Sequence, residues 1–262
     1  MRCLQVSVAL VGAGHLAAAS TPQEGASELR FIACPVYRDT DSGAKSGCWL
    51  ATDPVTGIRY DISLSNTKPD WNRPALVEGR LADRPGSECG APVLEPLVVS
   101  VMPGSCTRHE LPAEGFGGHH YVLSPRHILQ IDKPGPIPVG PYSSQVFRAL
   151  FGYDRSFLAY QYDDWLLDKA VSYIKAAHPS RVTVTGYADT RPQDVSGTVL
   201  AERASIARER AERVAEALRR LGVARTLIKT RWQSDAKVVD AELADGLRAP
   251  TRRRVDIDVH IP

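Results

Sequence analysis

The segment from Arg181 to Gly222 constrains the fold of this chain more than any other. Val182 and Val184 alternate with two threonines, the period-two pattern of a half-buried strand. Gly186 is expected to end this strand, and residues 187–190 to form a loop that contains Asp189. A long amphipathic helix should follow, with its apolar stripe at Leu200, Ala204, Ala207, Ala211, Val214, Leu218 and Leu221. Gly222 is a suitable residue to end that helix.

The rest of the C-terminal half alternates strand and helix. Strands are expected near 146–151 and 226–232, and a clean alternating strand at 255–261. A helix should begin near Asp163 and Asp164 and end at His178-Pro179, and 242–247 is a candidate short helix. The helix that ends at His178-Pro179 should bury one stripe, made of Leu166, Leu167, Ala170, Val171, Ile174 and Ala177. The pattern predicts an α+β domain over 142–262, a βαβαβ(α)β two-layer sandwich with helices on one face of a sheet.

The N-terminal half predicts a different fold, a small all-β domain over 28–110. Candidate strands at 29–33, 48–52, 58–63, 75–81 and 97–102 are bounded by turn residues. Five short strands suggest a small closed barrel, similar to an oligonucleotide/oligosaccharide-binding fold. Trp49, Trp71 and Tyr60 are interpreted as core rather than as a binding face.

The cysteines suggest export. Residues 1–19 resemble a secretory signal peptide, whose removal takes away Cys3. Cys34, Cys48, Cys89 and Cys106 remain, an even set that favours disulfides in an exported chain. Three connectivities are possible; pairing Cys34 with Cys48 and Cys89 with Cys106 closes short local loops and is favoured.

Composition excludes several function classes. The formal charge is +2 without a long single-sign block, so nucleic acid is not an expected partner. After the signal segment, no run approaches the ~20 apolar residues of a membrane helix.

The Pro- and Gly-rich residues 111–141 are predicted to form a stiff linker. Its His119, His120 and His127 lack partners at ligand spacing, so no metal or cofactor is predicted.

Four ordered motifs give the C-terminal half a family resemblance. They are Gly186-Tyr187-Ala188-Asp189; Ile206 to Ala211 with Val214 and Gly222-Val223; Arg252 to Ile257; and Leu150 to Asp154. Together they resemble the OmpA-like peptidoglycan-binding family over about 145–261. The chain departs from the family pattern at Ala188, where the family has Thr, and at Arg252, where it has Asn.

The resemblance implies a function in the cell envelope. In the family, the motif Asp and a helix Arg hold the diaminopimelate of the peptidoglycan stem peptide. A carboxylate suits the ligand's ammonium, and a guanidinium suits its carboxylate. The expected protein is therefore a non-catalytic, periplasmic tether in a Gram-negative bacterium, associated with the outer membrane. Its N-terminal β domain would face another envelope protein.

The ligand residues implied by the resemblance are Asp189, Tyr187, Arg253 and one helix arginine. Counting back from Gly222 selects Arg210, whereas counting forward from Asp189 selects Arg203, so the chain holds extra residues in between. Arg210 is preferred because packing should fix the C-terminal part of the helix, with the insertion projecting outward.

Two alternatives remain open. One is a periplasmic protein-interaction module that keeps the OmpA-like fold but has lost peptidoglycan binding. The other is an enzyme with Asp189 and Asp194 as paired carboxylates, but no histidine or metal set accompanies them.

Overall fold

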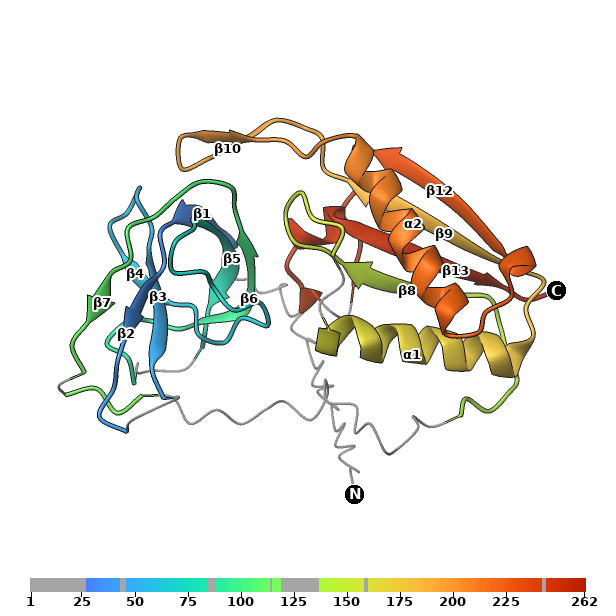
Figure 1. Cartoon of the computed structure of the whole chain (residues 1–262), viewed down its shortest axis with the longest axis horizontal. Coiled ribbons are helices and arrows are strands. Elements are labelled where there is room, and N and C mark those ends of the chain that lie inside the picture. The colour runs from blue at the N-terminus through green and yellow to red at the C-terminus, as the bar shows by residue number, and fades with distance from the viewer. Residues whose placement is uncertain are drawn as a thin grey trace, which may run out of the picture.

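The computed structural model describes residues 27–42, 46–83, 88–113, 115–118, 137–157, 160–241 and 244–262, with the backbone alone given for 160–166 (Figure 1). The predicted signal peptide, the three loop histidines, most of the predicted linker and the side chains of Asp163, Asp164 and Leu166 lie outside this description.

The N-terminal half is all-β, as predicted, and forms two sheets. One has the order β1 (Leu29–Ala33), β5 (Ala75–Leu81) and β6 (Leu94–Val101), and is antiparallel. The other has the order β4 (Arg59–Asp61), β3 (Cys48–Thr52), β2 (Val36–Arg38) and β7 (Glu110–Leu111). The prediction of a closed barrel is wrong for the described residues, since the sheets meet through an isolated bridge between Asp61 and Val93. Pro96 within β6 has no backbone donor, which suits an edge strand rather than a closed ladder.

Aromatic side chains fill the space between these two sheets. Trp49 and Tyr60 are buried in one cluster with Phe31, and Trp71 packs against it. The rings of Trp49 and Trp71 meet edge-on with centroids 4.9 Å apart. The interpretation of these aromatics as core is confirmed.

The disulfides join Cys34 to Cys106 and Cys48 to Cys89, with Cα–Cα separations of 5.7 and 6.1 Å. The favoured local pairing is therefore wrong. In the antiparallel β2–β3 ladder, Val36 lies opposite Leu50 and Arg38 opposite Cys48. Cys34 precedes this ladder, so the two cysteines sit at its opposite ends, roughly 13 Å apart at the rise of a strand. A disulfide does not span that distance.

The C-terminal half is the predicted two-layer sandwich. Its sheet has the order β12 (Ile228–Ser234), β9 (Arg181–Ala188), β13 (Arg254–His260) and β8 (Gln145–Leu150). β12 runs parallel to β9, and the other pairs are antiparallel. Helices α1 (Tyr160–Ala177) and α2 (Ser205–Arg220) cover one face (Figure 1). Short 3-10 turns, η2 (Arg225–Leu227) and η4 (Pro250–Arg252), precede β12 and β13. Val182, Val184, Val255 and Ile257 form the core with both helices.

Two details around Asp189 differ from the sequence-based expectation. Strand β9 continues through Gly186, where a Cβ would lie 1.9 Å from the Ala207 carbonyl oxygen. Glycine here permits α2 to approach the strand closely, so it does not end the strand. Helix α2 begins at Ser205, and Gly222 ends it with φ +95°.

The inserted residues form a hairpin of β10 (Gln193–Val195) and β11 (Thr198–Leu200), with Ser196 and Gly197 at its turn. Both turn residues have positive φ, the requirement of a two-residue hairpin turn. Leu200 therefore lies on a strand, not on the helix. Its burial comes from a cluster with Val195, Leu76 and Met102.

This hairpin joins the two halves of the chain. It extends from the C-terminal half to β1 (Figure 1). Further contacts are two hydrogen bonds from the backbone N–H groups of Arg248 and Ala249 to Glu28. Leu76 of β5 clusters with Leu200, and Val98 of β6 packs against the cluster that contains Leu247, so the C-terminal half covers the outer face of β5 and β6. The exact domain and linker boundaries stay predictions.

Candidate functional site

Asp189 follows the last residue of β9 and is 4% exposed. Its Oδ2 accepts a hydrogen bond of 2.7 Å from Gln193 Nε2. Its Oδ1 is buried without a hydrogen-bond partner. Two guanidiniums lie near that oxygen, Arg252 at 3.7 Å and Arg191 at 3.9 Å, both beyond hydrogen-bond distance. The strand end therefore holds a carboxylate oxygen that is ready to accept a donor.

Arg210 is fully buried beneath this strand end, and all its guanidinium nitrogens are engaged. Nε donates to the Arg155 carbonyl at 2.8 Å, NH1 to the Tyr187 carbonyl at 2.8 Å, and NH2 to the Gly152 carbonyl at 3.1 Å. NH1 and NH2 also donate hydrogen bonds to the Glu202 carboxylate, at 2.9 and 2.5 Å, in the bidentate geometry of an arginine–carboxylate pair. Arg210 fixes the site's framework.

Glu202 is the residue that sequence reasoning missed. It is 4% exposed, and its carboxylate accepts hydrogen bonds from the backbone N–H groups of Asp189 (2.8 Å) and Asp154 (2.7 Å) in addition to Arg210. Glu202 lies before α2, which begins at Ser205, so helical spacing could not identify it as the partner of Arg210. The signal available in the sequence was the repeat of Glu202-Arg203-Ala204 in Glu209-Arg210-Ala211.

Arg203, the alternative to Arg210, does not join the site. It precedes α2, its side chain is 56% exposed, and it pairs with Asp154 at 2.8 Å and with Glu209 at 3.3 Å. Placing Arg203 on the same helix as Arg210 is therefore wrong. The hairpin ends the inserted segment before the helix begins.

Tyr187 takes part in the hydrogen bonding around Arg210 through its backbone carbonyl. Its carbonyl accepts from Arg210, whereas its ring lies under Arg254, whose guanidinium carbon is 4.0 Å from the ring centroid. Burial raises the pKa of the Tyr187 phenol. These contacts give the side chain a packing role.

Arg253 is fully buried and pairs with Glu78 of β5, the central strand of its sheet. Arg30 of β1 donates to the same carboxylate at 2.9 Å and to Gln193 Oε1 at 2.5 Å. Gln193 in turn binds Asp189. A continuous polar network therefore runs from Asp189 through both halves of the chain to Arg253.

The Asp189 carboxyl is expected to make stability depend on pH. Burial raises its pKa, outweighing the Gln193 hydrogen bond and the nearby Arg191, Arg253 and Arg30, which lower it. A carboxyl whose pKa is raised on folding contributes stability below its unfolded pKa, about 3.9, and loses it as pH rises through the folded pKa. The Asp189→Asn variant should therefore gain stability relative to the wild type as the pH rises above about 4.

Thermal melts at several pH values check this expectation, with Asp240→Asn as the exposed control. A melting-temperature difference between the wild type and Asp189→Asn that stays constant with pH would contradict it.

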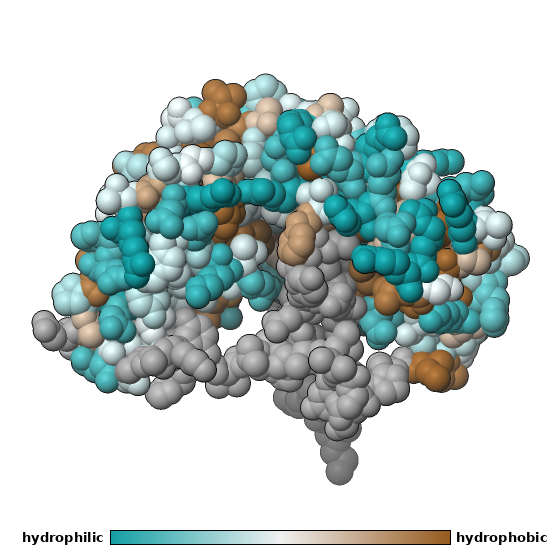
Figure 2. Space-filling view, in the orientation of Figure 1, coloured by the Kyte–Doolittle hydropathy of each residue, from teal (hydrophilic) through white to brown (hydrophobic). Residues whose placement is uncertain are grey.

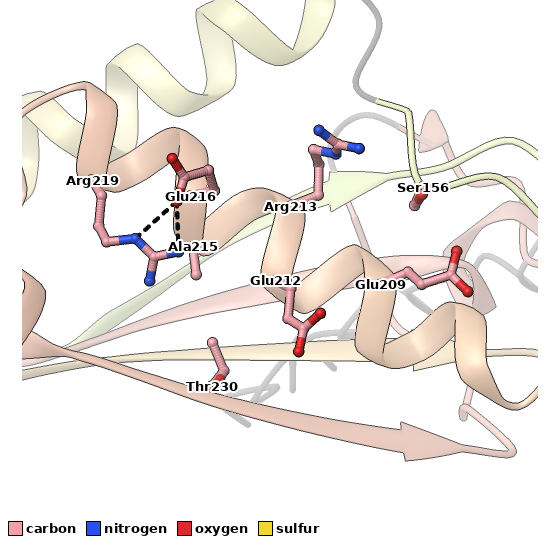
Figure 3. Close-up of a pocket in the computed structure, with 8 residues that line it drawn as sticks. All are labelled: Ser156, Glu209, Glu212, Arg213, Ala215, Glu216, Arg219 and Thr230. Carbon is pink, nitrogen blue, oxygen red and sulfur yellow. Dashed lines mark hydrogen bonds and ion pairs between the residues drawn. The ribbon is translucent and has the colours of Figure 1, made fainter.

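A separate surface groove lies along α2 (Figure 3). Ser156, Thr230 and α2 residues line it, and its Arg219 and Glu216 pair with each other at 2.8 Å. Figure 2 shows hydrophilic residues over this side of the molecule. The groove contains none of the predicted ligand residues.

Among the described residues, the ligand atoms of Cys48, Cys89 and Asp61 lie close enough together for a metal. The two sulfurs form a disulfide, however, and metal ligation requires thiolates.

Among comparisons with known proteins, the match to a family model falls in the C-terminal half. Residues 150–252 match the OmpA family. An OmpA-like domain from Francisella tularensis is 24% identical, covers 45% of this chain and 73% of its own, with TM-score 0.36. The cell wall anchor of the T6SS from Pseudomonas aeruginosa is 20% identical, with 45% and 82% covered and TM-score 0.35. The peptidoglycan-associated lipoprotein from Burkholderia pseudomallei is 23% identical, with 42% and 86% covered and TM-score 0.32. The comparison with curated proteins found no match.

Proposed function

Because residues 150–252 form an OmpA-family domain, we propose that this chain is a non-catalytic cell-envelope protein that binds peptidoglycan. Its ligand is the diaminopimelate of the stem peptide, and Asp189 is the central ligand residue. The observation that carries the proposal is the buried Asp189 Oδ1, which has no hydrogen-bond partner. An unsatisfied buried acceptor costs about 1–3 kcal/mol, a cost that a ligand's ammonium relieves.

The environment of Asp189 supports a zwitterionic ligand. A carboxylate at a strand end, with guanidiniums at 3.7 and 3.9 Å, offers both signs of charge within the span of one amino-acid centre. Diaminopimelate carries an ammonium and a carboxylate at such a centre. The N-terminal β domain, packed against the same strand end, would be held at the wall along with any partner that it binds.

The proposed location is the periplasm of a Gram-negative bacterium, in association with the outer membrane. No described helix is long and apolar enough to cross a membrane. The two disulfides suit an oxidising compartment such as the periplasm.

The second candidate, an interaction module without peptidoglycan binding, also has an observation in its favour. Arg210 and Arg253 are fully buried, and each is paired with a carboxylate of the chain itself, Glu202 and Glu78. In this state neither guanidinium is free for a ligand.

Co-sedimentation of the full chain with purified insoluble peptidoglycan separates the two candidates. Wild type should sediment with the wall, and Asp189→Ala should stay in the supernatant, because the acceptor for the ammonium is gone. Asp240→Ala, on an exposed carboxylate, should bind like wild type. Absence of wild-type binding would favour the interaction module. Release of soluble wall fragments would contradict the non-catalytic assignment.

The full chain is required because Arg253 would lose Glu78 in the isolated C-terminal half. Arg210→Ala is unsuitable as a binding test. It would leave the buried Glu202 without its cation, so a loss of binding would report misfolding.

A further inference from the structure

We infer that Arg252 holds the carboxylate of the ligand whose ammonium Asp189 accepts, an inference that rests on the proposed function. Arg252 occupies a position where the resembled family has Asn. This substitution places a guanidinium beside Asp189. It ends η4, directly before β13, and its NH1 lies 3.7 Å from Asp189 Oδ1.

The arginines expected from the resemblance are already saturated. Arg210 donates to three carbonyls and to Glu202, and Arg253 donates to Glu78 and to the Phe151 carbonyl. Both side chains are completely buried. A ligand carboxylate would have to displace an internal carboxylate from a dry site, which is costly because the displaced charge needs a new partner.

Arg252 is available by contrast. Its side chain is 22% exposed. Among the described residues, the carboxylate that lies within 4 Å of its guanidinium is that of Asp189. The contact is too long for a hydrogen bond, so the fork of Arg252 keeps its donors for another acceptor. Arg191 is also near Oδ1, at 3.9 Å, but it already pairs with Asp235 at 2.7 Å.

The charges around Asp189 suit an ammonium and a carboxylate together. An ammonium that donates to the buried Asp189 Oδ1 would have to move aside the guanidiniums of Arg191 and Arg252, whose side chains are 49% and 22% exposed and lie beyond hydrogen-bond distance of that oxygen. The neighbouring carboxylate would then accept the bidentate fork of Arg252. A ligand with an ammonium but no carboxylate would meet two positive guanidiniums without compensation. Arg252 therefore selects zwitterionic groups over simple amines.

Isothermal titration of the full chain with two soluble stem peptides tests the inference. One peptide contains meso-diaminopimelate; the other contains lysine there, which keeps the ammonium and removes the carboxylate. Wild type should prefer the first about tenfold or more. Arg252→Ala should weaken binding of the diaminopimelate peptide roughly ten- to hundredfold, to the level of the lysine peptide.

Two further variants complete the experiment. Arg208→Ala, on the outer face of α2 where it pairs with Glu212, should leave both affinities unchanged. Arg252→Gln repeats the test with a longer polar side chain in case the alanine variant does not fold, as judged by thermal melts.

The outcomes distinguish the inference from the proposed function. If wild type binds and both Arg252 variants keep its preference for diaminopimelate, Arg252 does not hold the carboxylate, while the proposed function stands. An equal loss for both peptides also overturns the inference, because it indicates a general effect on the site. Wild type that binds neither peptide nor the wall overturns both.

Discussion

Replacing Glu202 with alanine is expected to lower the free energy of unfolding by about 3–5 kcal/mol, the usual cost of leaving a buried charge without its partner. The carboxylate accepts from two guanidinium nitrogens of Arg210 and from the backbone N–H groups of Asp154 and Asp189. Its removal leaves these four donors unsatisfied in a region shielded from water. Urea denaturation followed by circular dichroism measures the change.

Glu209→Ala is the matched control for this prediction. Glu209 is the glutamate of the second Glu-Arg-Ala sequence, as Glu202 is of the first. Its side chain is 41% exposed, however, and it pairs with Arg203 on the surface. A surface pair contributes about 0–1 kcal/mol, so the control should be nearly neutral. Equal losses for the two variants would show that Glu202 is not the anchor of the strand end.

Replacing Glu78 with alanine is the second large effect, again about 3–5 kcal/mol. Glu78 and Arg253 are both completely buried, and the Glu78 carboxylate pairs with the Arg253 guanidinium. Arg30 pairs with the same carboxylate. Because the pair joins β5 to the residue directly before β13, its loss should weaken the packing of the two halves as well as the fold. Urea denaturation of the full chain again gives the measurement.

A double variant makes this prediction specific. Glu78→Met combined with Arg253→Met removes both charges and keeps apolar volume, which in other buried pairs is nearly neutral or stabilising. It should recover much of the loss seen in Glu78→Ala. Glu110→Ala, from an exposed pair with Arg108, is the surface control. If the double variant is no more stable than Glu78→Ala, the loss does not arise from the unpaired Arg253 but from packing or from Arg30, which also loses its carboxylate partner.

These buried pairs change how the resemblance is read. The motif arginines Arg210 and Arg253 keep their sequence positions, but the structure gives them internal partners. Asp189 keeps an unsatisfied oxygen, and Arg252 lies beside it. The proposed pair of ligand residues, Asp189 and Arg252, therefore differs from that of the family pattern, and the titration with two peptides tests it.

Local patterns predicted most of the fold. The alternation in β9 and β13, the turn residues that bound β1, β3 and β5, and the apolar stripe of α2 from Ala207 onward depend on neighbours a few residues away, so the sequence displays them directly. The hairpin at Ser196-Gly197 was also visible in principle, because this dipeptide is a turn signal. It was missed because Leu200 and Ala204 extend the helical stripe of α2 by coincidence of spacing.

Pairing across long sequence separations was decided by tertiary structure. Glu78 alternates with Val77 and Gly79, so a period-two reading places it on a solvent face; the C-terminal half covers that face and supplies Arg253. The cysteine partners depended in the same way on the register of β2 against β3.

The sequence by itself thus determined two folds, an all-β half and a two-layer α+β sandwich, and the position of Asp189 after a strand. Tertiary structure decided which charges are buried, and with which partners. The physical reason is that hydrophobic periodicity is a local property of the chain, whereas the cost of burying a charge is set by groups that meet only after folding.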